Sequence, residues 1–196
     1  MLITQTGTYK TRGGATALDE AALLERVAAE EMDAFETLYR VYHPRLKRFI
    51  ERMTRQPAWV DEVLDDTMLV VWRKAHTYNH DSKVSTWIFA IAYRQTLKAL
   101  KRRDAVPEFG QVEDASAVAP GPDVELQQHE LRQYLDDALG TLSAEHRAVI
   151  ELTYYLGYAC REIADILDCP VDTVKTRMFY ARRKLKVVLA ARREAI

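Results

Sequence analysis

The chain has 196 residues, with a hydrophobic content of 48% and a charged content of 29%, which suits a folded protein of one medium or two small domains. Its 28 basic and 29 acidic side chains give a net charge of −1, which excludes a uniformly basic protein. The two cysteines, Cys160 and Cys169, are too few for a disulfide framework, and the five histidines lack metal-ligand spacing. We therefore expect reduced thiols, no metal and no cofactor.

Residues 1–18 are polar and lack the apolar segment of a signal peptide, so we expect a disordered tail rather than a targeting sequence. No stretch of the chain approaches the roughly 20 apolar residues that a membrane span needs. Both observations predict a cytoplasmic protein.

The first predicted domain covers residues 19–103 and contains only helices. Asp19 is placed to cap a helix over about 20–30, and a second helix starts near Met32 with apolar residues spaced three and four apart. Pro44 predicts a bend or a new first turn within this second segment.

The next predicted helix has the clearest periodicity in the chain, with acidic residues near its start and basic residues at its end. Its apolar stripe consists of Val60, Val63, Leu64, Met68, Val71, Trp72 and Ala75. Residues 77–86 are polar and predict a loop. A long helix without glycine or proline follows, from Trp87 to about Arg103.

Proline and glycine punctuate residues 104–126, where apolar periodicity is absent, so we expect a flexible linker there. The second predicted domain, 127–196, is again helical, with Gly157 ending one helix and two more following over about 160–167 and 171–190. No strand pattern appears. The predicted fold is therefore all-α, with two small helical domains joined by a flexible acidic linker.

Charge is segregated along the chain. There are six basic and no acidic residues from Lys83 to Arg103, and eight basic and no acidic residues from Thr173 to Arg193. The segment from Asp104 to Asp136 has the opposite balance, with eight acids and one base. A basic helix face fits the phosphate backbone of nucleic acid, because each neutralised phosphate releases counterions, whereas a solubilising surface normally mixes both signs.

In the first basic segment, Arg94, Lys98 and Lys101 share one face of the predicted helix, with Trp87 near the same face. The second segment belongs to a helix-turn-helix motif over 160–189, in which the start of the second helix enters the major groove. The residues that this motif leaves exposed there are Asp172, Thr173, Lys175, Thr176, Arg177 and Tyr180. Among them, Arg177 suits a bidentate contact with guanine.

Two stretches together resemble the extracytoplasmic-function (ECF) family of RNA polymerase sigma factors. The first resembles sigma region 2 and reads DAFETLYRVYHPRLKRFI, WVDEVLDDTMLVVWRKAHTY and STWIFAIAYRQTLKALKRR. The second resembles region 4 and reads ALGTLSAEHRAVIELTYYLGYACREIADILDCPVDTVKTRMFYARRKLK. The likeness covers about three-quarters of the chain. It implies a non-enzymatic sigma factor that binds core RNA polymerase, recognises the −10 and −35 promoter elements and helps to open DNA.

The resemblance assigns residues to three surfaces. Those expected to bind the clamp helices of the polymerase β′ subunit are Asp65, Asp66, Leu69, Trp72 and Arg73. Those expected at the −10 element, where a flipped-out base is held, are Tyr78, Asn79, Ser82, Lys83, Trp87, Arg94, Lys98 and Lys101. Those expected at the −35 element are Arg161, Thr173, Lys175, Thr176, Arg177, Tyr180 and Arg182.

Further partners follow from the resemblance: the β flap for region 4, and a separate anti-sigma factor that holds a monomeric chain inactive. The acidic linker is expected in the RNA-exit path of the polymerase. The chain departs from the family pattern at Val84, where an aromatic residue is usual, and at Arg94 and Lys98, where many relatives carry Asn and Asp. These departures predict a different base pocket and a more basic helix.

Three other functions compete with this interpretation. A conventional helix-turn-helix regulator explains residues 131–196 but not the first domain. A sigma-like adaptor that titrates an anti-sigma protein should lack the two basic faces. An enzyme should show a nucleophile–base pair, a metal cluster or a phosphate loop, and none appears in the sequence.

Overall fold

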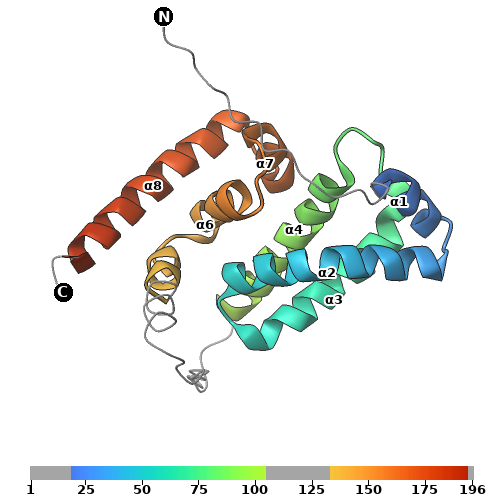
Figure 1. The fold of residues 1–196 in the computed structure, drawn as a ribbon, viewed down its shortest axis with the longest axis horizontal. Helices are drawn as coiled ribbons and strands as arrows, with labels where there is room; N and C mark the ends of the chain where they lie inside the picture. Colours follow the sequence, from blue (N-terminus) through green and yellow to red (C-terminus); the bar gives the residue numbers. More distant parts are fainter. Residues whose placement is uncertain (1–18, 105–132, 194–196) are drawn as a thin grey trace, which may run out of the picture.

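The computed structural model describes residues 19–104 and 133–193, and these residues are helical with no strand among them, as predicted (Figure 1). The helices of the N-terminal half (residues 19–104) are α1 (Glu20–Ala28), α2 (Met32–Thr54), α3 (Pro57–Lys74), the 3-10 turn η1 (Ala75–Thr77) and α4 (Val84–Asp104). Those of the C-terminal half (residues 133–193) are a helix over 133–140, α6 (Ala144–Ile150), the π-helical turn η2 (Glu151–Tyr155), α7 (Cys160–Leu167) and α8 (Val171–Arg193).

The predicted tail (1–18) and nearly all of the predicted linker (104–126) lie outside the described residues. Within the described residues, no helix is long and apolar enough to cross a membrane, and no group of metal-binding side chains comes together.

The N-terminal half is a bundle in which α2 and α3 lie side by side and α4 packs against both (Figure 1). Asp19 caps α1 as predicted, because its Oδ1 accepts hydrogen bonds from the backbone N–H groups of Ala21 and Ala22, each at 3.1 Å. The apolar stripes of all four helices meet in a shared core. The largest fully buried side chains of this core include Leu38, Tyr42, Phe49, Leu64, Met68 and Phe89.

Two boundaries in this half differ from the prediction. Pro44 does not bend or restart the chain but lies on the exposed side of α2, which is one continuous helix. Proline removes one helical hydrogen bond, and burial of Tyr42 and Leu46 on either side of it offsets that loss. Helix α4 begins at Val84 rather than Trp87, because Val84, like Ile88 one turn later, is buried against the core.

The C-terminal half contains the predicted helix-turn-helix, formed by α7 and α8. Asp168 ends α7 in the left-handed conformation, with φ of 51°, and Val174 and Met178 bury the inner face of α8. Gly157 has a φ of 72°, which glycine adopts without strain, and it separates η2 from α7 as predicted. Helix α8 runs along the outer edge of the molecule (Figure 1).

The two halves pack against each other in a single hydrophobic cluster. Helix α4 lies against α7, where the rings of Phe89 and Tyr158 meet edge to face with centroids 5.6 Å apart. Helix α2 touches α6 at the other end of the contact. The molecule is therefore closed on itself, an arrangement that the sequence did not predict.

Candidate nucleic-acid and protein interfaces

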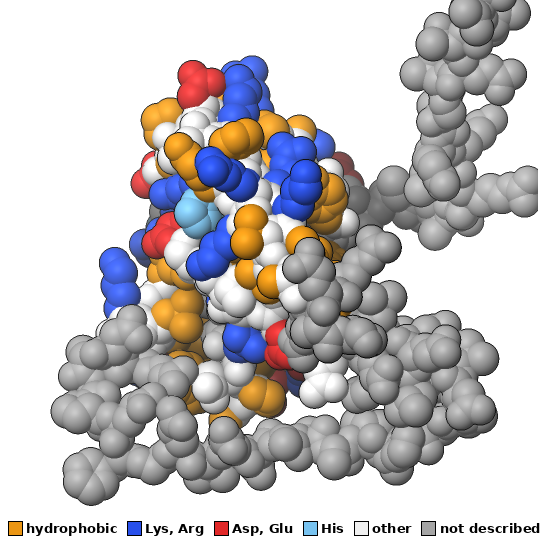
Figure 2. Space-filling model, turned by 90° about the vertical axis from the view of Figure 1, so that its left-hand side faces the viewer, with side chains coloured by type: hydrophobic (Ala, Val, Ile, Leu, Met, Phe, Trp, Pro, Cys, Tyr) orange, Lys and Arg blue, Asp and Glu red, His pale blue; other side chains and the backbone are white. Residues whose placement is uncertain are grey.

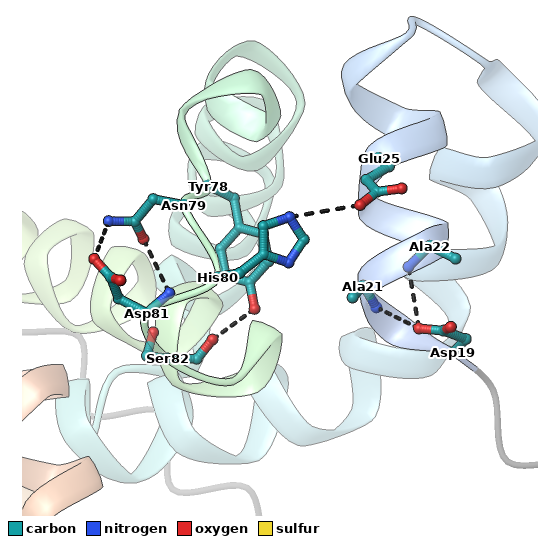
Figure 3. Close-up of polar contacts among 9 residues, drawn as sticks. All are labelled: Asp19, Ala21, Ala22, Glu25, Tyr78, Asn79, His80, Asp81 and Ser82. Atoms are coloured by element: carbon teal, nitrogen blue, oxygen red, sulfur yellow. Dashed lines mark hydrogen bonds and ion pairs between the residues drawn. The ribbon is translucent and has the colours of Figure 1, made fainter.

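The loop between η1 and α4 carries the residues predicted to hold a flipped base, and it is ordered by its own contacts (Figure 3). The Tyr78 hydroxyl donates to the backbone oxygen of Ser82 at 2.5 Å. The Asn79 side chain hydrogen-bonds to the carboxylate of Asp81, and its Oδ1 accepts from the Asp81 backbone N–H at 3.3 Å. These bonds give the loop one defined shape without any ligand.

Aromatic rings surround Tyr78. Its ring lies 4.7 Å from the imidazole of His80 and 5.9 Å from the indole of Trp87, measured between centroids. His80 points across to α1, where its Nε2 is 3.5 Å from Oε1 of Glu25 (Figure 3). Burial raises the pKa of Tyr78, so its hydroxyl stays a neutral donor. The structure brings Tyr78 and Trp87 together, as a stacking site for a base requires.

The outward face of α4 is basic, as predicted. Arg94, Lys98 and Lys101 are all exposed. The adjacent Arg102 is partly neutralised, because its Nη2 lies 2.8 Å from Oε1 of Glu62 on α3. Lys98 makes no ion pair with any other described residue.

Two residues of the predicted −10 surface are not free at the surface: one is buried and the other is held in an ion pair. Val84, predicted to alter the base pocket, is 3% exposed and belongs to the core. Lys83 is exposed but already paired, because its Nζ lies 2.7 Å from Oε1 of Glu162 in the C-terminal half.

The predicted polymerase-binding residues gather on one side of α3. Asp65, Asp66 and Arg73 are exposed, and Leu69 is 44% exposed although it is apolar. Trp72 is half-buried, with its indole edge-on to a phenylalanine ring of α2 at 5.1 Å.

Sequence reasoning missed the contribution of α2 to this surface. Phe35 packs against Trp72, Tyr39 lies beside Asp65, and Met32 is 64% exposed. The pKa of Tyr39 is raised by burial and by the neighbouring Asp65 carboxylate. The signal available in the sequence was that Phe35 and Tyr39 share one helix face.

On the helix-turn-helix, most of the predicted −35 residues point outward from α7 and α8. The exposed ones are Arg161, Lys175, Thr176, Tyr180 and Arg182. Figure 2 shows this side of the molecule, where Lys and Arg side chains gather over its upper part and acidic side chains are sparse.

Two predicted −35 residues are only half exposed. Thr173 lies in the first turn of α8, and Arg177 donates from Nη1 to the Sγ of Cys169 at 3.7 Å. Lys175 is held 3.0 Å from the carboxylate of Asp172, one turn earlier.

An apolar groove of about 570 Å³ lies between the helix over 133–140, η2 and the C-terminal part of α8. The apolar side chains along it include Leu135, Leu139, Ile150, Tyr154, Leu185 and Leu189, and the cations at its edge are Arg182 and Lys186. The sequence analysis did not predict this groove. The structure leaves Leu135 38% and Tyr154 59% exposed, which a buried stripe does not explain.

Comparison with known proteins places this chain in a family. Residues 38–106 match the family described as Sigma-70 region 2, and residues 132–185 match Sigma-70, region 4. The chain is 30% identical over 174 residues to the ECF RNA polymerase sigma factor SigK of Mycobacterium sp. (strain KMS), covering 86% of this chain and 89% of the relative. It is 31% identical over 177 residues to the ECF RNA polymerase sigma factor SigM of Mycobacterium tuberculosis (strain ATCC 25618 / H37Rv), covering 90% and 88%.

Two solved structures share the fold. The structure of CnrH in complex with the cytosolic domain of CnrY matches with a TM-score of 0.67 at 24% identity, covering 88% of this chain and 97% of CnrH. The sigma factor RpoE, solved in complex with the anti-sigma factor NepR from Bartonella quintana, matches with a TM-score of 0.62 at 23% identity, covering 80% and 96%.

An all-helical chain with two basic helix faces and a helix-turn-helix defines a DNA-binding transcription protein. The matches are more specific: the chain belongs to the ECF family of RNA polymerase sigma factors, the class that binds core polymerase and directs promoter-specific initiation. The family resemblance given by the sequence is confirmed.

Proposed function

We propose that the chain recognises the −10 element with the loop over 78–83 and α4, and the −35 element with α7 and α8. The observation that carries this proposal is the outward basic face of the helix-turn-helix, where Lys175, Thr176 and Arg161 are exposed while Val174 anchors α8 from behind. Lysine suits phosphate contacts, which fix the register of a helix in the groove, and Thr176 suits a base edge or a phosphate.

The −10 role draws on the aromatic pair and the basic face of α4. Tyr78 and Trp87 offer ring faces to an extruded base, and stacking on such rings is worth about 1–3 kcal/mol per base. Arg94, Lys98 and Lys101 then follow the phosphates of the flanking strand. The hydrogen bond from Tyr78 to Ser82 keeps the loop in place for this contact.

Binding to core polymerase is assigned to the exposed side of α3 and the neighbouring residues of α2. Leu69 is an exposed apolar side chain on the same side of α3 as the carboxylates of Asp65 and Asp66, and Met32 is a second exposed apolar side chain at the start of α2. An apolar patch with charges at its edge is typical of a protein interface, since the apolar part supplies affinity and the charges supply orientation. We assign this surface to the β′ clamp helices.

The groove of the C-terminal half suits an amphipathic helix. Its apolar walls fit the hydrophobic side of such a helix, and Arg182 and Lys186 can pair with acids on its polar side. We assign the groove to the β flap in the active complex and to an anti-sigma factor in the inactive one. We also place residues 19–103 and 127–196 as separate domains of a monomeric, non-enzymatic protein that works in the cytoplasm without a cofactor.

The test is reconstitution with core RNA polymerase, followed by gel filtration and run-off transcription on a library of genomic fragments. Leu69→Arg should abolish co-elution with the core enzyme, whereas Val187→Arg, at an even more exposed apolar residue on α8 (64% against 44%), should not. Lys175→Glu should keep co-elution but lose the promoter-specific transcript, with Arg183→Glu on the same helix as its control. A wild-type chain that neither co-elutes nor yields a specific transcript would refute the proposal.

A further inference from the structure

The ring of Tyr78, on which we expect a flipped base to stack, is already in contact with a side chain of its own loop. The imidazole of His80 lies 4.7 Å from the Tyr78 ring, measured between centroids, with the two planes tilted by 52°. In Figure 3 this imidazole lies across the tyrosine ring, with one nitrogen turned towards α1. Aromatic rings that pack together have centroids about 4.5–7 Å apart, so His80 and Tyr78 form a packed pair.

No base fits between these two rings. Stacked bases are about 3.4 Å apart, so a base held between two parallel rings needs about 7 Å between them. The 4.7 Å separation of Tyr78 and His80 is well short of that distance. Trp87, the other ring beside Tyr78, is packed against the core, whereas the His80 side chain is 52% exposed. A base that stacks on Tyr78 must therefore displace a ring, and His80 is the ring that is free to move.

The backbone at His80 is fixed by its neighbours in the loop. Its φ is 63°, in the left-handed region that histidine adopts more often than most residues do. Oδ1 of Asn79 accepts from the backbone N–H of Asp81 at 3.3 Å, and the Asn79 amide also bonds to the Asp81 carboxylate, so two bonds span His80 (Figure 3). The hydroxyl of Tyr78 closes the loop by donating to the backbone oxygen of Ser82. These bonds present the imidazole to the tyrosine ring in one conformation.

Helix α1 holds the imidazole from the other side. Nε2 of His80 lies 3.5 Å from Oε1 of Glu25, which projects from the middle of α1. The helix is itself anchored, because Asp19 caps its start and Tyr42 of α2 donates to Oε2 of Glu20 at 2.7 Å. Glu25 therefore reaches the loop from a fixed element. The sequence analysis predicted no function for α1, and this contact connects α1 to the −10 site.

We propose that His80 is a positioning residue of the −10 site: its imidazole covers the Tyr78 ring in the free chain, and the flipped base must displace it from that ring. Glu25 of α1 determines how firmly the imidazole is held. This role of His80 rests on the proposed function, because it takes Tyr78 as the ring on which the base stacks. The −10 strand then binds less tightly than it would to an uncovered Tyr78, and α1 contributes to promoter affinity although no promoter contact is assigned to it.

The first experiment measures whether the imidazole covers Tyr78 in solution, without DNA or polymerase. Proton NMR of the full chain gives a separate Hε1 signal for each histidine, and His80→Asn identifies the signal of His80 by its loss. Tyr78→Leu should move that signal downfield, because the tyrosine ring no longer shields the proton. Tyr180→Leu, at an exposed tyrosine of α8, should leave the signal in place. A His80 signal that Tyr78→Leu does not move would overturn the contact.

The second experiment measures DNA binding. The probe is a labelled single strand with the non-template −10 sequence of a promoter found by run-off transcription, and fluorescence anisotropy follows its binding to the reconstituted holoenzyme. His80→Asn removes the imidazole but suits the left-handed backbone, and it should bind the strand roughly threefold to tenfold more tightly. His76→Asn, at an exposed histidine of η1, should match wild type. Glu25→Gln should gain roughly twofold, whereas Glu36→Gln, which breaks an exposed ion pair with Arg40 on α2, should gain nothing.

Abasic strands separate displacement of the ring from a general change in the loop. Each −10 position is made abasic in turn, and the gain of His80→Asn should vanish at one position only, the position whose base stacks on Tyr78. A gain that persists on every abasic strand would overturn the proposal, as would unchanged or weaker binding of His80→Asn to the intact strand. His80→Gly, which adopts the same backbone without strain, repeats the test without a side chain. If the wild-type holoenzyme binds no strand, the proposed function fails and the role of His80 fails with it, while the NMR comparison still decides whether the imidazole covers Tyr78.

Discussion

The two ends of the contact between the halves are held by opposite kinds of ion pair. At the α2–α6 end, Glu151 is buried, and burial raises its pKa to about 7 despite the nearby Arg52 and Arg147 guanidinium groups. At the α4–α7 end, Glu162 is 23% exposed and its partner Lys83 is 74% exposed, and the hydrogen bond with Lys83 lowers the pKa of Glu162. The position of Glu151 therefore destabilises its ionised carboxylate, whereas the position of Glu162 stabilises its ionised carboxylate.

The difference indicates what each end contributes. A buried pair whose acid has a raised pKa costs more in desolvation than it returns in attraction, so it specifies geometry rather than adding stability. An exposed pair adds little but costs little. Stability at the α4–α7 end must then come from the apolar contact of Phe89 with Tyr158, and at the α2–α6 end from the hydrogen bonds of Arg147.

The largest expected effect is that of Phe89→Ala on α4. Phe89 is fully buried between the rings of Phe49 and Tyr158, so its truncation leaves a cavity that joins both halves. We expect the free energy of unfolding in urea to fall by about 3–5 kcal/mol. Phe179→Ala on α8 is the control, because Phe179 is 59% exposed and should change stability by less than about 0.5 kcal/mol. Equal effects would mean that the apolar end is not packed as described.

Next in size is Arg147→Lys at the other end. Lysine keeps the charge but cannot span four carbonyl oxygens, so at least one buried acceptor loses its donor. The expected loss is about 2–3 kcal/mol in the same urea experiment. Arg183→Lys, at an exposed position of α8, should be close to neutral. A neutral Arg147→Lys would show that water replaces the missing donor.

Glu151→Gln should raise the free energy of unfolding, whereas removing one charge of an ion pair usually lowers it. The groups that face Glu151 are Arg52 on α2, Asp136 on the helix over 133–140 and Arg147 on α6, and its Oε1 has no hydrogen-bond partner among the described residues. Because the folded pKa is raised from 4.5 to about 7, wild-type stability falls between these pH values as the unfolded chain ionises first.

Glutamine cannot ionise, so the variant should match wild type near pH 4.5 and exceed it by about 3 kcal/mol at pH 8. Urea unfolding of wild type and Glu151→Gln across this pH range measures the difference directly, because all other titrating groups contribute equally to both proteins. A variant that is less stable than wild type at pH 8 would show that the attraction of Arg52 outweighs burial.

The sequence predicted most of the fold because helix periodicity and breakers are local signals. The apolar stripe of α3, the cap at Asp19 and the turn before α8 all appear where they were expected. The predictions for Pro44 and for the start of α4 were wrong for one reason. Burial of Tyr42, Leu46 and Val84 in the tertiary core overrides the local preference of the backbone, and no local sequence pattern shows which residues the core will bury.

The candidate surfaces were predictable in part. Exposed basic residues such as Lys98 and Lys175 follow from charge segregation and helical spacing. The groove along Leu135 does not, because an apolar stripe at helical spacing has the same sequence whether another helix covers it or not. The contact of Arg52 with Glu151 joins residues 99 apart in the chain, and no sequence spacing encodes a pair at that distance.

The smallest expected change in the free energy of unfolding comes from breaking the Lys83–Glu162 ion pair. Lys83→Glu should shift the urea midpoint only slightly, and added salt should reduce the shift because the Lys83 side chain is 74% exposed. Glu162→Lys should cost more, since Glu162 also accepts from the Ala159 backbone N–H at 2.9 Å at the start of α7. The double exchange should recover the ion pair but not this cap.

The charge of Glu162 should change the free energy of unfolding in the opposite direction to the charge of Glu151. The lowered pKa of Glu162 means that its contribution is present above the ordinary carboxyl range and is lost as the pH falls through the lowered value. Acid should therefore weaken the α4–α7 end while it relieves the α2–α6 end. At high pH the urea midpoint of Glu162→Gln should lie below that of wild type and the midpoint of Glu151→Gln above it, and both differences should vanish as the carboxylates are protonated towards low pH. Differences of the same sign for both variants at high pH would mean that the two carboxylates share one environment.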